Sequence, residues 1–210
     1  MGRILAILLL LLIAVAAGVY IAYYRADLVV KTALEQLGPT VIGAPVDAQS
    51  VDVSPKEGRV NIRGLDVGNI PGYSSKYALR VDEVKVIVDP MTVTNDVVVI
   101  REIVVDVPRI SYERGPRAIN LQPIIQKIEA RFKRRVVVER LEVRGGKILV
   151  TTTGAKGQGL TIELPSVLLR DLGRDKGGIT VREIAQLVAT ALEARLPQKL
   201  LTELLADQKP

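Results

Sequence analysis

Two copies of one short pattern decide the fold: residues 99–112, VIREIVVDVPRISY, and residues 137–150, VVERLEVRGGKILV. In each copy the apolar residues alternate, slip by one position and then resume, which is typical of a strand with a bulge or a bend. Pro108 in the first copy and Gly145-Gly146 in the second are residues that bend a chain. Each copy therefore predicts a strand, a tight turn and a second strand. The alignment matches Ile103 with Leu141, Val105 with Val143, Arg109 with Lys147 and Ile110 with Ile148.

The same slip occurs upstream of the repeat. Leu79 and Val81 are followed there by an alternating run of Val84, Val86 and Val88. The whole pattern predicts a curved, mainly antiparallel sheet of about seven to nine strands over residues 41–175. The segments 97–107 and 136–138 contain runs of consecutive apolar residues, which predicts two apolar faces, one packed against helices and one lining a groove.

Helical spacing of apolar residues occurs in two further segments. Asn120 precedes one that ends near Phe132, and this helix is expected to cover one face of the sheet. Thr180 and Glu183 have capping-box spacing ahead of another. The C-terminal amphipathic helices, over residues 176–210, either pack on the sheet or contact a membrane or a partner. The predicted fold class is α+β: an N-terminal transmembrane helix, then the curved sheet with one inserted helix, then C-terminal helices.

A membrane segment is expected at the N-terminus. Residues 4–24 form 21 consecutive positions without a charge, enough for a helix about 31 Å long, which matches the apolar core of a bilayer. We expect residues 1–25 to be a retained single-pass anchor and residues 26–40 to be a helical continuation and linker. The N-terminus is placed in the cytoplasm and the domain in the periplasm. A cleaved signal peptide is the alternative, because Ala14-Val15-Ala16 has the form of a cleavage site.

The composition removes most catalytic chemistry, because the chain contains no histidine, cysteine or tryptophan. This excludes Ser-His and Cys-His catalysis, disulfides, zinc fingers and imidazole metal sites. Ser74, Ser75 and Lys76 share a loop, but adjacency in sequence does not supply the burial that a Ser-Lys nucleophile needs. We therefore expect no enzymatic activity, no cofactor and no metal.

Residues 127–147 form a basic run, with eight lysine or arginine residues against three acidic ones. Its densest part consists of Arg131, Lys133, Arg134 and Arg135, which are expected to contact an anionic surface. Nucleic acid is not expected as a partner, because the run contains a single aromatic residue for stacking on bases. Membrane lipid fits the run better, and a merely solvated basic face is the alternative.

Several segments in a fixed order carry a family resemblance: VNIRGLDVGN at 60–69, PGY at 71–73, YALRVDEVKVIV at 77–88 and residues 98–112, with Asn120 shortly after. They resemble the N-terminal region of AsmA-like envelope proteins, where L-x-V-G-N-P-x-G-F leads into A-x-x-x-V-x-V-x-V, I-x-x-I-x-V-x-x-P-x-V and G-x-x-N. Here one residue is inserted before the proline, and tyrosine replaces phenylalanine. The resemblance covers roughly the first 122 residues.

The resemblance implies a membrane-anchored periplasmic protein related to bridge-like lipid-transfer proteins, whose curved sheets form an apolar-lined groove. Full-length relatives are several times longer, so a chain of 210 residues would form one short groove segment. We expect it to bind or guide lipid in that groove at the inner membrane and to contribute to envelope lipid homeostasis. The expected groove residues are Val86, Val88, Val105, Leu141 and Val143.

The alternative is a non-catalytic envelope scaffold or assembly factor, whose sheet is a closed core and which binds an envelope protein partner. One substitution separates the two hypotheses. An open groove predicts that Val143→Asp leaves a cooperative melt and lowers co-purified lipid, whereas a closed core predicts unfolding.

Overall fold

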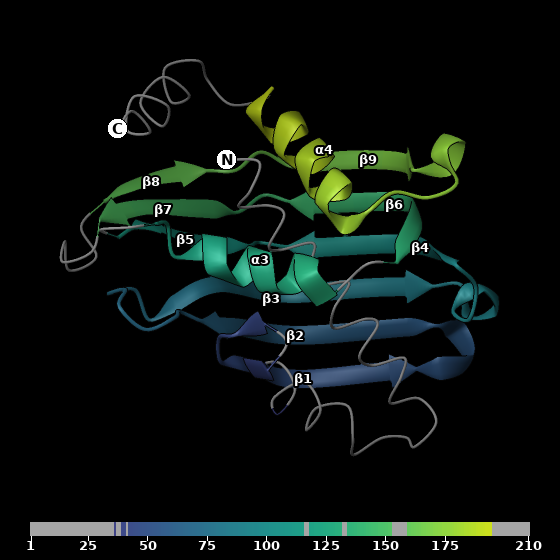
Figure 1. Ribbon diagram of the computed structural model, residues 1–210, viewed down its shortest axis with the longest axis horizontal. Coiled ribbons are helices and arrows are strands. Elements are labelled where there is room, and N and C mark those ends of the chain that lie inside the picture. Colours follow the sequence, from purple (N-terminus) through teal and green to yellow (C-terminus); the bar gives the residue numbers. More distant parts are fainter. Residues whose placement is uncertain are drawn as a thin grey trace.

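A computed structural model of the chain describes residues 42–115, 118–131, 134–152 and 159–194, together with residues 36, 39 and 40. They form one mixed sheet with two α-helices over the same face (Figure 1). The strands are β1 (Val46–Ser54), β2 (Arg59–Gly68), β3 (Tyr77–Val88), β4 (Val97–Asp106), β5 (Arg109–Arg114), β6 (Arg135–Arg144), β7 (Lys147–Thr152), β8 (Leu160–Glu163) and β9 (Val167–Leu172). The helices are α3 (Leu121–Arg131) and α4 (Val181–Glu193), with short 3-10 turns η2 (Pro55–Glu57), η3 (Pro90–Thr92) and η4 (Arg174–Lys176).

Strand β3 is the central strand of the sheet. On one side it pairs with β2, which pairs in turn with β1, and both pairings are antiparallel. On its other side it pairs with β4 through residues 83–88 and with β5 through Leu79 and Arg80. Because β4 and β5 both run antiparallel to β3, they run in the same direction. They form one line of two consecutive strands beside β3. Strands β6 and β7 form the next line, and β9 and β8 the outermost one.

The tight turns predicted at Pro108 and at Gly145-Gly146 are therefore wrong. The chain bends at these points and continues in the same direction, with positive φ angles of 46° at Val107, 61° at Gly145 and 133° at Gly146. Helix α3 connects the end of β5 to the start of β6 and so carries the chain back along the sheet. As a result β4 pairs with β6, and β5 pairs with β7, both in parallel. Parallel strands need a crossover of this kind. The sheet is thus mixed, with two parallel pairings among otherwise antiparallel ones.

The internal repeat corresponds to this parallel pairing, because its two copies lie side by side in the register of the sequence alignment. The matched residues are all cross-strand partners: Ile103 with Leu141, Val105 with Val143, Arg109 with Lys147, and Ile110 with Ile148.

The predicted bulge is confirmed at the slip in β4, whereas the ladders of β3 and β6 show no register shift at their slips. In β4, Arg101 is left out of the ladder, because Glu102 pairs with Ile87 and Ile100 with Val88. Beside the slip in β6, Asp171 of β9 has a φ of 53°, and beside the slip in β3, Gly64 of β2 has a φ of 59°. Each slip thus marks a local backbone irregularity.

The core lies between the helices and one face of the sheet. Ile124, Ile128, Ile184 and Val188 from α3 and α4 are fully buried, in one apolar cluster with inward-facing strand residues. Helix α3 confirms the helix predicted after Asn120, and α4 begins with the predicted capping box. The capping box joins the side chains and backbones of Thr180 and Glu183 reciprocally, which satisfies donors at the helix start.

The opposite face of the sheet is polar, and the prediction of two apolar faces is wrong. The residues that alternate with the core positions include Arg63, Glu83, Lys85, Glu102 and Arg140, and these carry a network of ion pairs. The consecutive apolar residues of β4 do not change this, since Val104 lies opposite Lys85 on the polar face. One face is therefore covered by helices and the other presents charge.

The predicted anchor, most of its helical continuation and the end of the C-terminal helical stretch lie outside the described residues; residues 36, 39 and 40 of the continuation are helical. Among the residues that the structure describes, no helix is long and apolar enough to cross a membrane.

Candidate functional site

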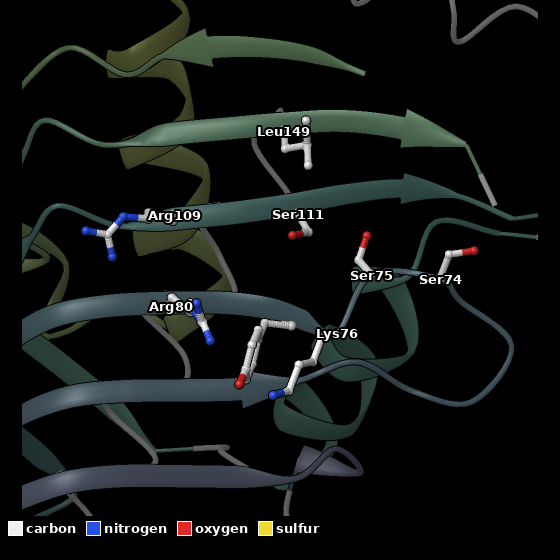
Figure 2. A pocket seen from close by; sticks show the side chains of 8 residues that line it. Ser74, Ser75, Lys76, Arg80, Arg109, Ser111 and Leu149 are labelled. Carbon is white, nitrogen blue, oxygen red and sulfur yellow. The ribbon is translucent and has the colours of Figure 1, made fainter. Parts of the chain in front are cut away.

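The polar face of the sheet contains a pocket of about 420 Å³ at the end where β3 begins (Figure 2). Its lining combines basic, hydroxyl and aromatic side chains from the 69–76 loop, β3, β5 and β7. The lining residues are Ser74, Ser75, Lys76, Tyr77, Arg80, Arg109, Ser111 and Leu149. Three of these are basic and none is acidic, so the pocket is suited to an anion.

A bulge at the start of β3 gives the pocket its aromatic wall. Tyr77 pairs with Gly68 and Leu79 with Val67, so Ala78 has no partner of its own in the ladder. The extra residue brings Tyr77 and Arg80, three positions apart, onto the same face. The guanidinium carbon of Arg80 then lies 3.6 Å from the centroid of the Tyr77 ring.

The basic floor of the pocket results from direct strand pairing. Arg80 of β3 lies opposite Arg109 of β5, which lies opposite Lys147 of β7. Like charges placed opposite each other repel, and nearby carboxylates reduce the cost. Asp66 lies 3.2 Å from Arg80 Nε, and Asp82 accepts hydrogen bonds of 2.7 and 3.0 Å from Arg109.

Lys76 adds a further positive charge at the rim. Its ammonium group lies 4.9 Å from the centroid of the Tyr77 ring, and no carboxylate in the described part of the chain is paired with it. The pKa of the Tyr77 phenol is lowered from its usual value of 10.0, chiefly by Lys76, with Arg80 adding to the effect. The direction of this shift agrees with a positive potential around the ring.

The 69–76 loop is held in place by a buried carboxylate. Glu113 of β5 is completely buried and accepts hydrogen bonds from the backbone N–H groups of Ser74, at 2.6 Å, and Ser75, at 2.7 Å. Burial of a charged group is costly unless hydrogen bonds compensate for lost hydration. These two bonds therefore couple the fold of β5 to the position of the loop that lines the pocket.

Buried Asn120 connects the same loop to the start of α3. Its side chain accepts from the Glu113 N–H at 3.0 Å and donates to Ser111 O at 2.9 Å and to Asn69 Oδ1 at 3.2 Å. Tyr73 donates its hydroxyl to Ala118 O at 3.0 Å. Asn69 and Asn120 thus meet in space, and Tyr73 ties the same loop to Ala118.

A second cavity, of about 570 Å³, shares Ser74, Ser75 and Lys76 with the basic pocket. The rest of its lining is mainly apolar, including Pro45, Ile70 and the side chain of Tyr73, and it reaches the segment that leads into β1. The loop therefore has a basic pocket and a more apolar cavity next to it.

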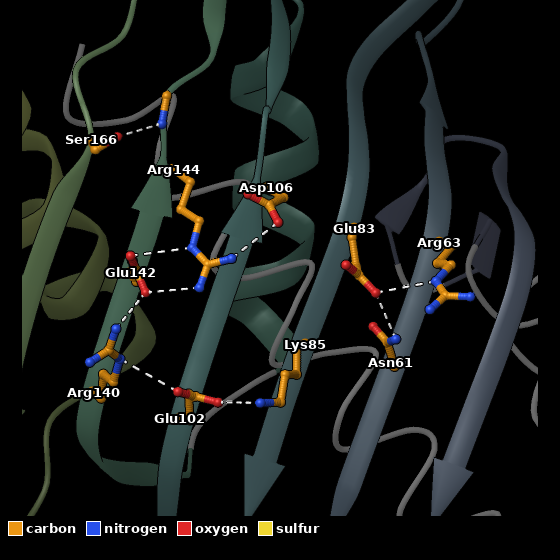
Figure 3. A network of polar contacts seen from close by, with 11 residues as sticks. Asn61, Arg63, Glu83, Lys85, Glu102, Asp106, Arg140, Glu142, Arg144 and Ser166 are labelled. Carbon is orange, nitrogen blue, oxygen red and sulfur yellow. Dashed lines mark hydrogen bonds and ion pairs between the residues drawn. The ribbon is translucent and has the colours of Figure 1, made fainter.

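Further along the polar face, charged side chains neutralise one another (Figure 3). Glu102 contacts Lys85 at 2.6 Å and Arg140 at 3.4 Å, while Glu142 contacts Arg140 at 2.6 Å and Arg144 at 3.2 Å. The pKa of Glu142 is lowered from 4.5, first by its hydrogen bond with Arg144 and then by that with Arg140. Each cation here has an acidic neighbour, whereas Lys76 in the pocket is paired with no carboxylate of the described residues.

The predicted groove residues are all buried and belong to the apolar core cluster, between 0% and 6% exposed. Val105 and Val143 are direct cross-strand neighbours, as their matched positions in the repeat suggest. None of the five lines either of the two cavities described above. The assignment of Val86, Val88, Val105, Leu141 and Val143 to a lipid groove stays a prediction.

The basic run is divided between described and undescribed residues. Arg134 donates to Val93 O at 2.7 Å, and Arg135 donates to the backbone oxygens of Lys176 and Gly178. These side chains therefore hold neighbouring loops, which makes them less free to bind an anionic surface. The side chain of Arg131 and residue Lys133 lie outside the described part, and the surface assignment of the run stays a prediction.

Sequence reasoning considered Ser74, Ser75 and Lys76 as a catalytic group and set them aside, but it missed Arg80, Arg109 and Glu113. The Ala78 bulge and the pairing of β3 with β5 bring these residues together, and both depend on tertiary structure. Comparison of the chain with protein-family models, curated proteins and solved structures gives no match. The AsmA-like resemblance therefore rests on the residues quoted above.

Proposed function

We propose that the protein is a single-pass inner-membrane protein, with its N-terminus in the cytoplasm and its sheet domain in the periplasm, that binds phospholipid without covalent chemistry. The observation that carries this proposal is the basic pocket on the polar face, with Lys76, Arg80 and Arg109 in its lining. A membrane-anchored domain lies close to phospholipid headgroups, and basic side chains near an anionic membrane surface each contribute about 1 kcal/mol.

The place of the pocket in the fold supports this proposal. Residues 39 and 43–45, which lead into β1, line the cavity that adjoins the pocket loop. Only 14 residues, 25–38, separate them from the uncharged stretch 4–24, and a helix of that length spans about 21 Å. A domain tethered so closely would keep the pocket near the headgroups.

The proposal assigns the charged headgroup to the pocket. An acyl-chain groove along Val105 and Val143 requires the helix-covered face of the sheet to open, because both residues are fully buried there. The scaffold hypothesis draws on the same burial, since it expects a closed core. Lipid retention therefore has to be measured separately for the pocket and for the core.

The test compares phospholipid retained by the full-length protein after detergent extraction, measured by native mass spectrometry, with that retained by the double variant Lys76→Gln/Arg80→Gln. Arg63→Gln is the matched control, because Arg63 lies on the same face, is exposed and pairs with Glu83 outside the pocket. We expect wild type and control to retain anionic phospholipid and the double variant to lose most of it. Equal retention in all three proteins would place the bound lipid outside the pocket and refute this proposal, and no retained lipid in any of them would favour the scaffold.

A further inference from the structure

Arg80 is oriented by its surroundings in a way that the other basic residues of the polar face are not. Its guanidinium group is stacked on Tyr77, with 3.6 Å between its central carbon and the ring centroid, and its Nε atom is 3.2 Å from Asp66 Oδ1. Stacking on the Tyr77 ring restricts the plane of the guanidinium, and its Nε atom, although close to Asp66, makes no hydrogen bond. Figure 2 shows Arg80 near Arg109, with Lys76 further along the same side of the sheet.

The remaining donors surround the same space. Arg109 lies directly opposite Arg80, and its terminal nitrogens are engaged by Asp82 at 2.7 and 3.0 Å, which fixes its position. Ser111 follows Arg109 on the same face of β5, at the alternating spacing of a strand, and lines the pocket with Ser75. The site therefore combines a stacked guanidinium, a second one fixed by Asp82, an ammonium group and hydroxyl groups.

We propose that this pocket is a phosphate-binding site, in which Arg80 and Lys76 contact the oxygens of a phosphate group. Arginine presents paired N–H donors that match two oxygens of a phosphate, whereas lysine acts as a point charge. Serine hydroxyls donate to the remaining oxygens. Tyr77 is a positioning residue, because it orients Arg80 by stacking.

The inference rests on the proposed function for the source of the phosphate, which is the headgroup of an anionic phospholipid. Inorganic phosphate offers the same chemistry from another source. The two sources differ in what else they would contact: a lipid carries glycerol and acyl groups that can reach the more apolar cavity across the 69–76 loop, and free phosphate does not.

The experiment uses isothermal titration calorimetry on the full-length protein in a nonionic detergent, with inorganic phosphate as one probe and dihexanoyl phosphatidylglycerol as the other. We expect both probes to bind, the lipid more tightly, and phosphate to compete with it. Arg80→Lys keeps the charge and loses the paired donors, so we expect affinity for both probes to fall about tenfold or more. Tyr77→Leu should weaken binding, whereas Tyr77→Phe, which keeps the ring, should bind as wild type does.

Arg63→Gln serves as the control for general charge, and a thermal melt of each variant confirms that it is folded. Binding of either probe that is unaltered by Arg80→Lys would overturn the inference, even if the protein retains lipid through another surface. Phosphate binding that depends on Arg80, without binding of the lipid probe, would support the site and identify free phosphate as its source. That outcome would refute the proposed lipid function alone.

Discussion

Val143→Asp distinguishes a closed core from an open groove, and the structure predicts that it unfolds the domain. Val143 is 0% exposed and lies between Val105 of β4 and Val167 of β9 on the helix-covered face. Val143→Ala removes two carbon atoms, worth about 1.6 kcal/mol in transfer free energy, and a cavity term brings the loss to about 2 kcal/mol. An aspartate at the same place adds the cost of burying an unpaired carboxylate, several kcal/mol, against a total stability of about 5–15 kcal/mol.

The assay is thermal unfolding of the full-length protein in detergent, followed by circular dichroism at 218 nm, a wavelength characteristic of sheet. We expect Val143→Ala to melt cooperatively at a lower temperature and Val143→Asp to show no cooperative melt. Leu160→Asp is the matched control, because Leu160 is 42% exposed on β8 and should tolerate the charge. A cooperative melt of Val143→Asp within about 1 kcal/mol of wild type would refute the closed core and restore the groove.

Further predictions concern the anchor, the loop and the response to acid. Protein extracted from membranes should begin at or near Met1, as Edman sequencing would show, and a mature N-terminus at Ala17 would refute a retained anchor. Glu113→Gln leaves one amide oxygen for the N–H groups of Ser74 and Ser75, so stability should fall by about 2 kcal/mol and hydrogen exchange should quicken selectively in the 69–76 loop. The pKa of Glu142 is lowered in the folded protein. Its contribution to stability is therefore present above the unfolded pKa of about 4.5 and is lost as the pH falls through the folded pKa. We expect the melting temperature to drop below about pH 4.5, and to drop less steeply in Glu142→Gln.

Features set by residues close together in the chain could be predicted from the sequence. The capping box of Thr180 and Glu183, the helix after Asn120 and the bulge at the apolar slip in β4 are all present. Each depends on interactions within a few residues, or on which side of a strand a residue faces. The repeat also indicated true neighbours, because parallel strands in register place equivalent residues opposite one another.

The direction of the chain after each bend could not be predicted. Pro108 and Gly145-Gly146 permit a reversal as readily as a bend, and the outcome depends on backbone angles such as the φ of 46° at Val107. The sequence also could not predict which face of the sheet each residue of a consecutive apolar run would occupy. Val104 lies opposite Lys85 among charges on the polar face, although its own sequence context is apolar. Such placements follow from pairing partners far away in the chain.

The distribution of buried polar residues supports a function at the pocket end of the sheet. Among the described residues, the buried polar or charged ones are Glu113, Asn120 and Thr151, and Glu113 lies opposite Thr151 where β5 and β7 pair. A core made only of apolar residues would avoid the cost of burying a carboxylate, and here the Glu113 carboxylate accepts two backbone hydrogen bonds from the 69–76 loop. These hydrogen bonds fix the backbone of Ser74 and Ser75, next to Lys76. The polar network thus positions the loop that forms the rim of the basic pocket, and replacing Glu113 should disturb ligand binding there before it disturbs the apolar core.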